Sequence, residues 1–231
     1  MLKLKYQMGN VKINIYGDAP NEYLDQLSEI NIRYFVIGQT KITAENIPHF
    51  ALSQDKLQSF NKVLEFSQEY KIPLIHLESS SLPLLTNTDR KIVLSVRAHI
   101  NIFTDRLLAK EWQFPEDECI IIPYGFEFNP LIHQRNEGII FHDDIPLKEI
   151  LSGALPVVKR SPKNLSIFTE FQNCLMFLSE DEKKYVYAKI SNMAKEDIIK
   201  IQKNAEKLML EKFPKNKFLT SWKESIEKVL K

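Results

Sequence analysis

Residues 54–77 read QDKLQSFNKVLEFSQEYKIPLIHL and contain two different hydrophobic periods. Apolar side chains recur at helical spacing in the first part: Leu57, Phe60, Val63, Leu64 and Phe66. This spacing predicts an amphipathic helix that ends before Pro73. The apolar run at residues 73–77 then predicts a buried strand. A helix that leads directly into a buried strand is typical of a βαβ unit, in which the strands are parallel.

The same alternation extends in both directions from this segment. Further strands are predicted at residues 11–16, 33–38, 100–103, 119–122, 138–141, 154–158 and 174–178. Helices are predicted at residues 21–29, 88–98, 104–112 (with Thr104 as the N-cap) and 146–153, and on both sides of Pro214. Right-handed crossovers place helices on both faces of a parallel sheet. The predicted fold class is therefore α/β, with Rossmann-like parallel sheets, flanking helices and a helical C-terminal tail.

Composition and charge restrict the classes of protein that fit. The 231 residues are 44% hydrophobic and 26% charged, which describes an ordinary globular protein. The formal net charge of +1 gives no global attraction to nucleic acid or to an anionic membrane. Cys119 and Cys174 lie in separate apolar runs, which favours reduced thiols. Because the sequence shows neither a signal-peptide pattern nor a run of about 20 apolar residues, we expect a cytoplasmic protein without a transmembrane segment.

Polar residues just beyond the predicted strands are the first candidates for chemistry, because open parallel sheets bind ligands there. His76 and Glu78 lie two residues apart at the end of a strand and therefore share a face. A histidine beside a carboxylate can act as a general base, and serines follow at residues 79–81. A structural histidine under a serine-rich turn is the alternative. His99, just before the next strand, is a third candidate.

Several motifs with well-understood chemistry are absent. The sequence contains no GxGxxG after its first predicted strand, no GxxxxGK[ST], no GxSxG and no HExxH. These absences argue against fingerprint dinucleotide binding, P-loop hydrolysis, a nucleophile elbow and zincin chemistry.

The segment that gives the strongest indication of function is Glu149-Ile-Leu-Ser-Gly-Ala-Leu-Pro-Val-Val158. A carboxylate in the first turn of a helix suits the hydroxyls of a bound ligand, and the small residues at 152–154 allow close helix–strand packing. Two other segments precede it along the chain, residues 103–112 and Ile122-Pro-Tyr-Gly125. In this order, the three segments resemble glycosyltransferases of the two-Rossmann-domain (GT-B) architecture, which use nucleotide-sugar donors. The resemblance extends over residues 72–230.

This resemblance implies a domain division and a set of functional residues. Residues 1–125 are expected to form a Rossmann-like acceptor-side domain, and residues 126–231 an abbreviated donor-side domain with the terminal helices. The glutamate of the specific segment is expected to bind the donor ribose, and basic groups to stabilise charge on the leaving diphosphate. The donor-side candidates are Glu149, Gly153, Lys159 and Arg160, and the catalytic candidates on the acceptor side are His76, Glu78 and His99.

The expected function is transfer of a sugar from a nucleotide-sugar donor to an unidentified acceptor. The nucleotide-sugar is a co-substrate, so no separate cofactor is expected. We also expect no metal, because no pair of aspartates has the strand-end arrangement of metal-dependent sugar transferases. Phe141 stands eight residues before Glu149, where retaining members carry a second glutamate. The segment between Pro130 and Gly138 is too short for the opening strands of a full second Rossmann domain.

Two other functions are compatible with the sequence. A nonenzymatic binding or interaction protein is expected if the shortened donor domain has lost its ligand. Glycosylation of modified DNA bases is the second alternative, and the net charge of +1 argues against it, because duplex binding needs a clustered basic surface. The lysine-rich residues 183–217 are the candidate for such a surface.

Overall fold

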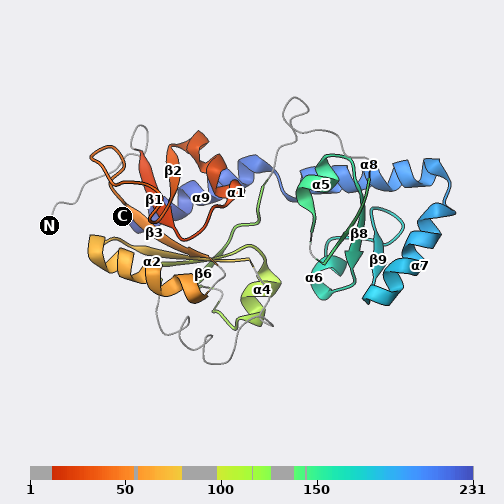
Figure 1. Cartoon of the computed structure of the whole chain (residues 1–231), viewed down its shortest axis with the longest axis horizontal. Coiled ribbons are helices and arrows are strands. Elements are labelled where there is room, and N and C mark those ends of the chain that lie inside the picture. The colour runs from red at the N-terminus through yellow and green to blue at the C-terminus, as the bar shows by residue number, and fades with distance from the viewer. Residues whose placement is uncertain are drawn as a thin grey trace. The chain divides into compact units, whose positions relative to one another are not determined.

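The computed structural model describes residues 12–54, 57–79, 98–115, 117–125, 138–143 and 145–230. The chain divides into two compact units, Met1–Tyr124 with Asn216–Lys231, and Gly125–Lys215. Each unit contains a parallel sheet with helices beside it (Figure 1). The helix expected at residues 88–98 lies outside the described residues.

The first unit is built on a parallel sheet. Its described strands are β1 (Ile13–Gly17), β2 (Ile32–Val36), β3 (Phe50–Gln54), β4 (Leu74–Glu78), β5 (Ile100–Phe103) and β6 (Cys119–Ile121). Its described helices are α1 (Glu22–Asp25), the 3₁₀ helix η1 (Gln26–Ile30), α2 (Leu57–Tyr70), α4 (Arg106–Glu111) and α9 (Lys215–Leu230). The strands follow the order β2-β1-β3-β4-β5-β6, and each neighbouring pair is parallel. The predicted α/β class is confirmed.

Strand β3 is absent from the strands that the sequence predicts. Its run, Phe50-Ala-Leu-Ser-Gln54, is short, follows Pro48 and has no clear alternation, so the hydrophobic period does not reveal it. The strand lies between β1 and β4. Because β2 and β3 lie on opposite sides of β1, the direction in which strands are added reverses there. The carboxyl ends of β1 and β3 thus form a topological switch point, where open α/β sheets bind ligands.

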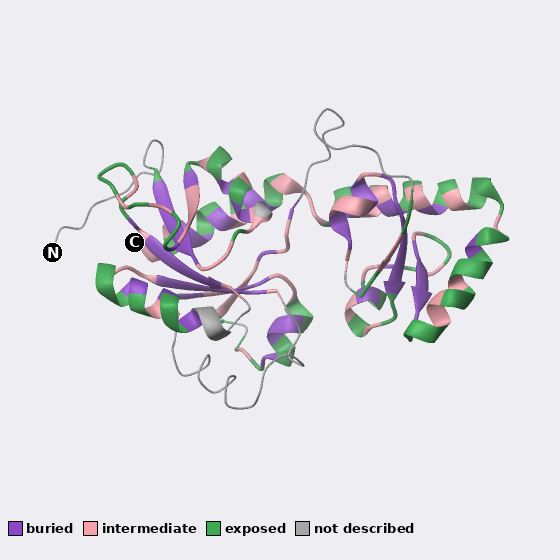
Figure 2. Ribbon diagram, viewed as in Figure 1, coloured by how far each residue is buried: buried purple, intermediate pink, exposed green. Residues whose placement is uncertain are grey.

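Helices cover both faces of the first sheet. On one face, α2 packs through Phe60 and Val63, and Trp112 at the end of α4 packs edge-on against Phe103. On the other face, α1, η1 and α9 contribute to a core that includes Trp222. Figure 2 shows buried strands and helices whose outer faces are exposed. Apolar side chains therefore cover both faces of the sheet, and polar groups can be accommodated at the strand ends.

The start of α4 differs from expectation. Asp105, not Thr104, is the N-cap, and its carboxylate accepts a hydrogen bond from the Leu107 N–H at 2.6 Å. The Thr104 N–H donates to the Glu78 carbonyl at 3.1 Å, so Thr104 continues the pairing of β4 with β5. The backbone of Thr104 therefore takes part in the strand pairing, and the prediction of Thr104 as the N-cap is wrong.

Helix α9 belongs to the first unit, whereas the resemblance implies that the terminal helices belong with residues 126–231. Phe218, Trp222 and Ile226 are at most 2% exposed and join the core formed by β1, β3, β4 and β5. The helical stripe identifies the buried face of α9. It carries no information about which of two apolar sheets that face covers.

The second unit also contains a parallel sheet. Its described strands are β7 (Ile139–His142), β8 (Leu155–Lys159) and β9 (Leu175–Phe177), in the order β7-β8-β9. Its described helices are α5 (Leu147–Leu151), α6 (Pro162–Leu165), α7 (Glu180–Ser191) and α8 (Lys195–Lys212). Helices α7 and α8 pack through Ile190 and Ile201 against Val157 and Phe177 of the sheet. This packing holds β8 at the centre and leaves its carboxyl end beside α6.

Candidate functional site

The switch point of the first unit is lined by a connected set of polar side chains. Asn21 caps α1, accepting a hydrogen bond from the Tyr23 N–H, and its side-chain amide donates to Gln54 Oε1 at 2.8 Å. The Gln54 amide in turn donates to the Tyr34 hydroxyl at 2.7 Å. Tyr34 donates to the Ala19 carbonyl at 2.6 Å. These bonds fix the carboxyl ends of β1 and β3 relative to each other.

Gly17 allows Tyr34 to reach this position. A Cβ atom at Gly17 would lie 1.9 Å from the Tyr34 hydroxyl oxygen, so any side chain there would displace the tyrosine. The close approach therefore explains why β1 ends in glycine at the switch point.

Asp18 lies beside this network, and one of its carboxylate oxygens has no hydrogen-bond partner among the described residues. It is half-buried, and its Oδ1 atom is buried without a hydrogen-bond partner. Burial raises the pKa of Tyr34, and the negative charge of Asp18 raises it further, so the two side chains lie close together. A buried carboxylate oxygen without a donor is costly, by about 1–3 kcal/mol, and requires an explanation. The sequence marks Asp18 only as a polar residue after a strand.

His76 and Glu78 lie on one face of β4, as predicted, but both are buried. They are 4% and 1% exposed, and His76 contacts the rings of Phe60 and Trp112. His76 Nδ1 lies 2.8 Å from the Ser53 hydroxyl, and Nε2 lies 3.5 Å from Glu78 Oε2. The pair is therefore part of the layer beneath α2 and α4, with the Glu78 end nearest the carboxyl edge.

His99 lies at the other end of the sheet. Its Nδ1 atom accepts a hydrogen bond from the Leu74 N–H, and Leu74 is the first residue of β4. His99 also lines a cavity of about 750 Å³ at the amino ends of β5 and β6. The structure brings His76 and Glu78 together, and it places His99 at the opposite edge.

In the second unit, Glu149 and Lys159 both lie toward the carboxyl ends of the strands. Glu149 is in the first turn of α5, which follows β7, and Lys159 is the last residue of β8. Glu149 is half-buried and Lys159 is exposed, and neither side chain has a hydrogen bond or ion pair within the described part of the chain. Both groups are therefore available to a ligand.

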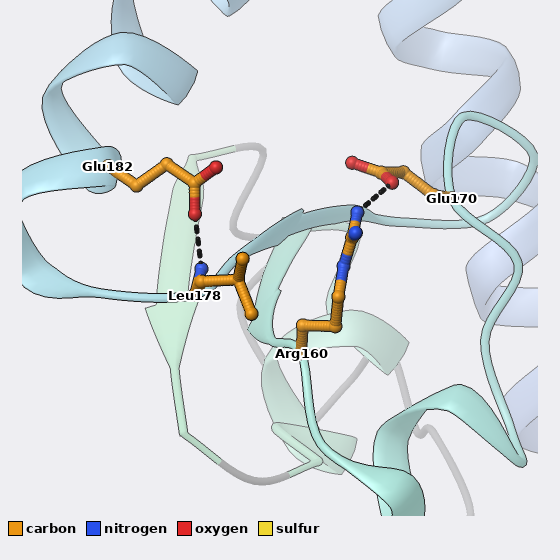
Figure 3. Close-up of polar contacts among 4 residues, drawn as sticks. All are labelled: Arg160, Glu170, Leu178 and Glu182. Carbon is orange, nitrogen blue, oxygen red and sulfur yellow. Dashed lines mark hydrogen bonds and ion pairs between the residues drawn. The ribbon is translucent and has the colours of Figure 1, made fainter.

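Arg160 is also exposed, but it already has a partner. Its Nη2 atom lies 2.5 Å from Glu170 Oε2. Figure 3 shows the two side chains pointing toward each other. The close-up also shows Glu182, whose carboxylate accepts the Leu178 N–H at the start of α7. Glu170 thus pairs with the Arg160 guanidinium, and Glu182 accepts the Leu178 N–H, both just after the strands of this sheet end.

Gly153 lies at the opposite end of β8 from these groups. It has a φ angle of +99° and follows α5, and the Gln202 amide donates to its carbonyl at 2.9 Å. Glycine tolerates this left-handed conformation without strain. The structure thus gives Gly153 a role in the turn between α5 and β8, and its contact with a donor stays a prediction.

The described residues contain no group of three or more side chains arranged to hold a metal ion. No helix among them is long and apolar enough to span a bilayer. Cys119 and Cys174 form no disulfide, and burial raises the pKa of Cys174 to about 12.

Solved structures of similar fold include a glycosyltransferase and a protein bound to UDP. HepE of Anabaena, in complex with UDP and glucose, matches with a TM-score of 0.68 and 8% identity, over 94% of this chain and 100% of that chain. A glycosyltransferase of Rickettsia africae matches with a TM-score of 0.57 and 8% identity, over 95% and 99% of the two chains. TarM matches with a TM-score of 0.53 and 8% identity, over 76% of this chain and 54% of TarM. The likeness shows that this chain has the fold of known glycosyltransferases. No family model and no curated protein matches the sequence.

Proposed function

We propose that this protein is a glycosyltransferase that moves a sugar from a UDP-sugar to a hydroxyl group of an acceptor, and that it acts in the cytoplasm. The observation that carries the proposal is the pair of unused groups at the carboxyl side of the second sheet, the half-buried Glu149 and the exposed Lys159. The presence of UDP and glucose in the HepE structure, whose whole length this chain matches, supports the choice of nucleotide.

The donor site combines one carboxylate with two cations. Glu149 accepts hydrogen bonds from the ribose hydroxyls, and Lys159 lies near the diphosphate, with Arg160 beside it in the sequence. Ammonium and guanidinium groups stabilise the negative charge that develops on the leaving UDP. No metal takes part in this proposal.

The acceptor site lies at the switch point of the first unit. Asp18 removes the proton of the acceptor hydroxyl while the oxygen forms a bond to the anomeric carbon. The bond from that carbon to the UDP oxygen breaks, and UDP leaves as the anion. Attack by the acceptor on the face opposite the leaving group inverts the anomeric configuration. Asp18 is half-buried, whereas His76 and Glu78 are only 4% and 1% exposed, so Asp18 is more accessible to an acceptor.

Nucleotide binding tests the donor site. Isothermal titration with UDP, GDP, ADP and their sugars is expected to show binding of UDP and its loss in Glu149→Ala. Exposed Glu196 on α8 supplies the matched control, because Glu196→Ala removes a carboxylate of the same length from the surface. A chain that binds none of the nucleotides would be the nonenzymatic protein, and salt-dependent binding of duplex DNA would favour the base-glycosylation alternative.

A further inference from the structure

Asn164, on α6, connects the two strand ends that border the donor site of the second unit. It is 0% exposed, and its Nδ2 atom donates to the Asp143 carbonyl at 3.1 Å and to the Lys159 carbonyl at 2.8 Å. The ladder between β7 and β8 ends one residue earlier, at His142 and Val158. The side chain therefore supplies a further link between these strands beyond their last backbone pair.

The orientation of this amide is set by its surroundings. Both neighbours are carbonyl oxygens, which only accept, so the NH₂ group must face them. The Asn164 Oδ1 atom is then left buried without a partner. A buried carbonyl without a donor is destabilising, and an apolar side chain of similar shape would avoid it. The asparagine therefore supplies two hydrogen bonds at the cost of one unsatisfied oxygen.

The bonds hold a short turn from both sides. The Lys159 carbonyl is held by Asn164, and the next N–H, of Arg160, donates to the Phe177 carbonyl of β9 at 2.7 Å. Ser161 then caps α6 by accepting the Asn164 N–H at 3.2 Å. The backbone of residues 159–161 is thereby fixed, while the side chains of Lys159 and Arg160 remain exposed. A fixed backbone under two exposed cations is the arrangement that preorganised anion binding requires.

We propose that Asn164 is a positioning residue for phosphate binding: its amide fixes the turn that presents Lys159 and Arg160 to the donor diphosphate. This inference rests on the proposed function, because it assumes that the turn receives a phosphate. It assigns the anion contact to residues 159–161 and leaves the nucleoside contact to α5. Loss of the amide is therefore expected to affect ligands with phosphates and to spare those without.

The test compares three ligands on two variants. Asn164→Asp keeps the shape but places an acceptor against two carbonyls, and Asn164→Ala removes the group. The dissociation constants of UDP and of inorganic pyrophosphate are expected to rise by about 10- to 100-fold, as when a hydrogen bond that orients a binding group is removed. The dissociation constant of uridine is expected to stay at the wild-type value. Ile190→Val, in the core between α7 and the sheet, is the control that lowers stability without contacting the turn.

Each result has a defined consequence. Wild-type affinity for UDP and pyrophosphate in Asn164→Asp would overturn the inference and leave the proposed function intact. Equal weakening of uridine would overturn it too, because the side chain would then support the whole unit. If the wild-type chain binds pyrophosphate in an Asn164-dependent way but not UDP, the proposed function fails and the positioning role stands. If the wild type binds neither ligand, both are overturned.

Discussion

Arg160 Nη2 lies 2.5 Å from Glu170 Oε2, so one cation of the proposed phosphate site is already paired within the chain. The side chains are 42% and 30% exposed, and pairs this accessible contribute only about 0.2–1 kcal/mol. A diphosphate can therefore compete with Glu170 for the guanidinium group. The glutamate nevertheless lowers the affinity by the strength of the pair.

Glu170→Gln is expected to tighten UDP binding, because it removes the competing charge and leaves Arg160 free. The pair strength sets the gain at up to about fivefold in the dissociation constant, measured by isothermal titration at low ionic strength. The double variant with Arg160→Ala should show no gain over Arg160→Ala alone. An equal gain in both backgrounds would mean that Glu170 acts through the general potential and not through Arg160.

Asp18→Asn is expected to reduce kcat while leaving UDP binding unchanged. The amide keeps the shape of the side chain but cannot accept a proton from the acceptor hydroxyl, and loss of a general base costs about 10²–10⁴-fold in rate. The measurement is sugar transfer or UDP release with a responsive acceptor, together with a UDP titration. Asp25→Asn, at the exposed end of α1, is the matched control and should retain activity. Full activity in Asp18→Asn would exclude Asp18 as the base.

The first unit is expected to lose stability in mild acid through His49. Burial lowers the pKa of His49 from 6.5, and the positive charge of Arg33 lowers it further. Its Nδ1 atom accepts a hydrogen bond from the Asn14 N–H at 3.1 Å, which protonation at that atom would remove. The unfolded chain thus binds the proton more readily. The contribution of His49 to the free energy of unfolding is fully present above pH 6.5. It decreases as the pH falls toward the lowered pKa of His49 in the folded state.

Urea unfolding between pH 7.5 and pH 5 measures this effect. In His49→Gln, which retains an acceptor but does not titrate in this range, the decrease in the free energy of unfolding with falling pH should be smaller than in the wild type. Equal slopes would assign the acid sensitivity to other groups.

The hydrophobic periods predicted most of the elements but not their assembly. Residues 100–103 form β5 as predicted, because an isolated apolar run between polar segments has few other solutions. The hydrophobic pattern did not predict a strand at Phe50–Gln54, although β3 lies inside the first sheet, because a short strand buried on both faces lacks alternation. With β3 missing, the switch point between β1 and β3 was also hidden, and Asp18 could not be distinguished from other polar residues after strands.

The sequence predicted where two candidate residues lie, because local sequence determines their positions, and their role in binding stays a prediction. Glu149 and Lys159 lie toward the carboxyl side of their sheet because a single helix and a single strand place them there. The pairing of Arg160 with Glu170 and the two bonds of Asn164 depend on chain segments brought together only by folding. Hydrophobic patterns contain no information on such contacts, and only the folded structure shows them.

Trp222→Ala is expected to destabilise the first unit, even though Trp222 lies 101 residues after Ile121, the end of β6. Trp222 is 1% exposed in the core beneath β1, β3, β4 and β5, and removing a buried aromatic side chain of this kind costs about 3–5 kcal/mol. Hydrogen exchange resolved by segment measures the effect: the amides of β1 and β4 should exchange faster, and those of β8 should not. Trp112→Ala, on the other face of the same sheet, should give the same pattern. Faster exchange confined to β8 and β9 would instead place α9 with the second unit.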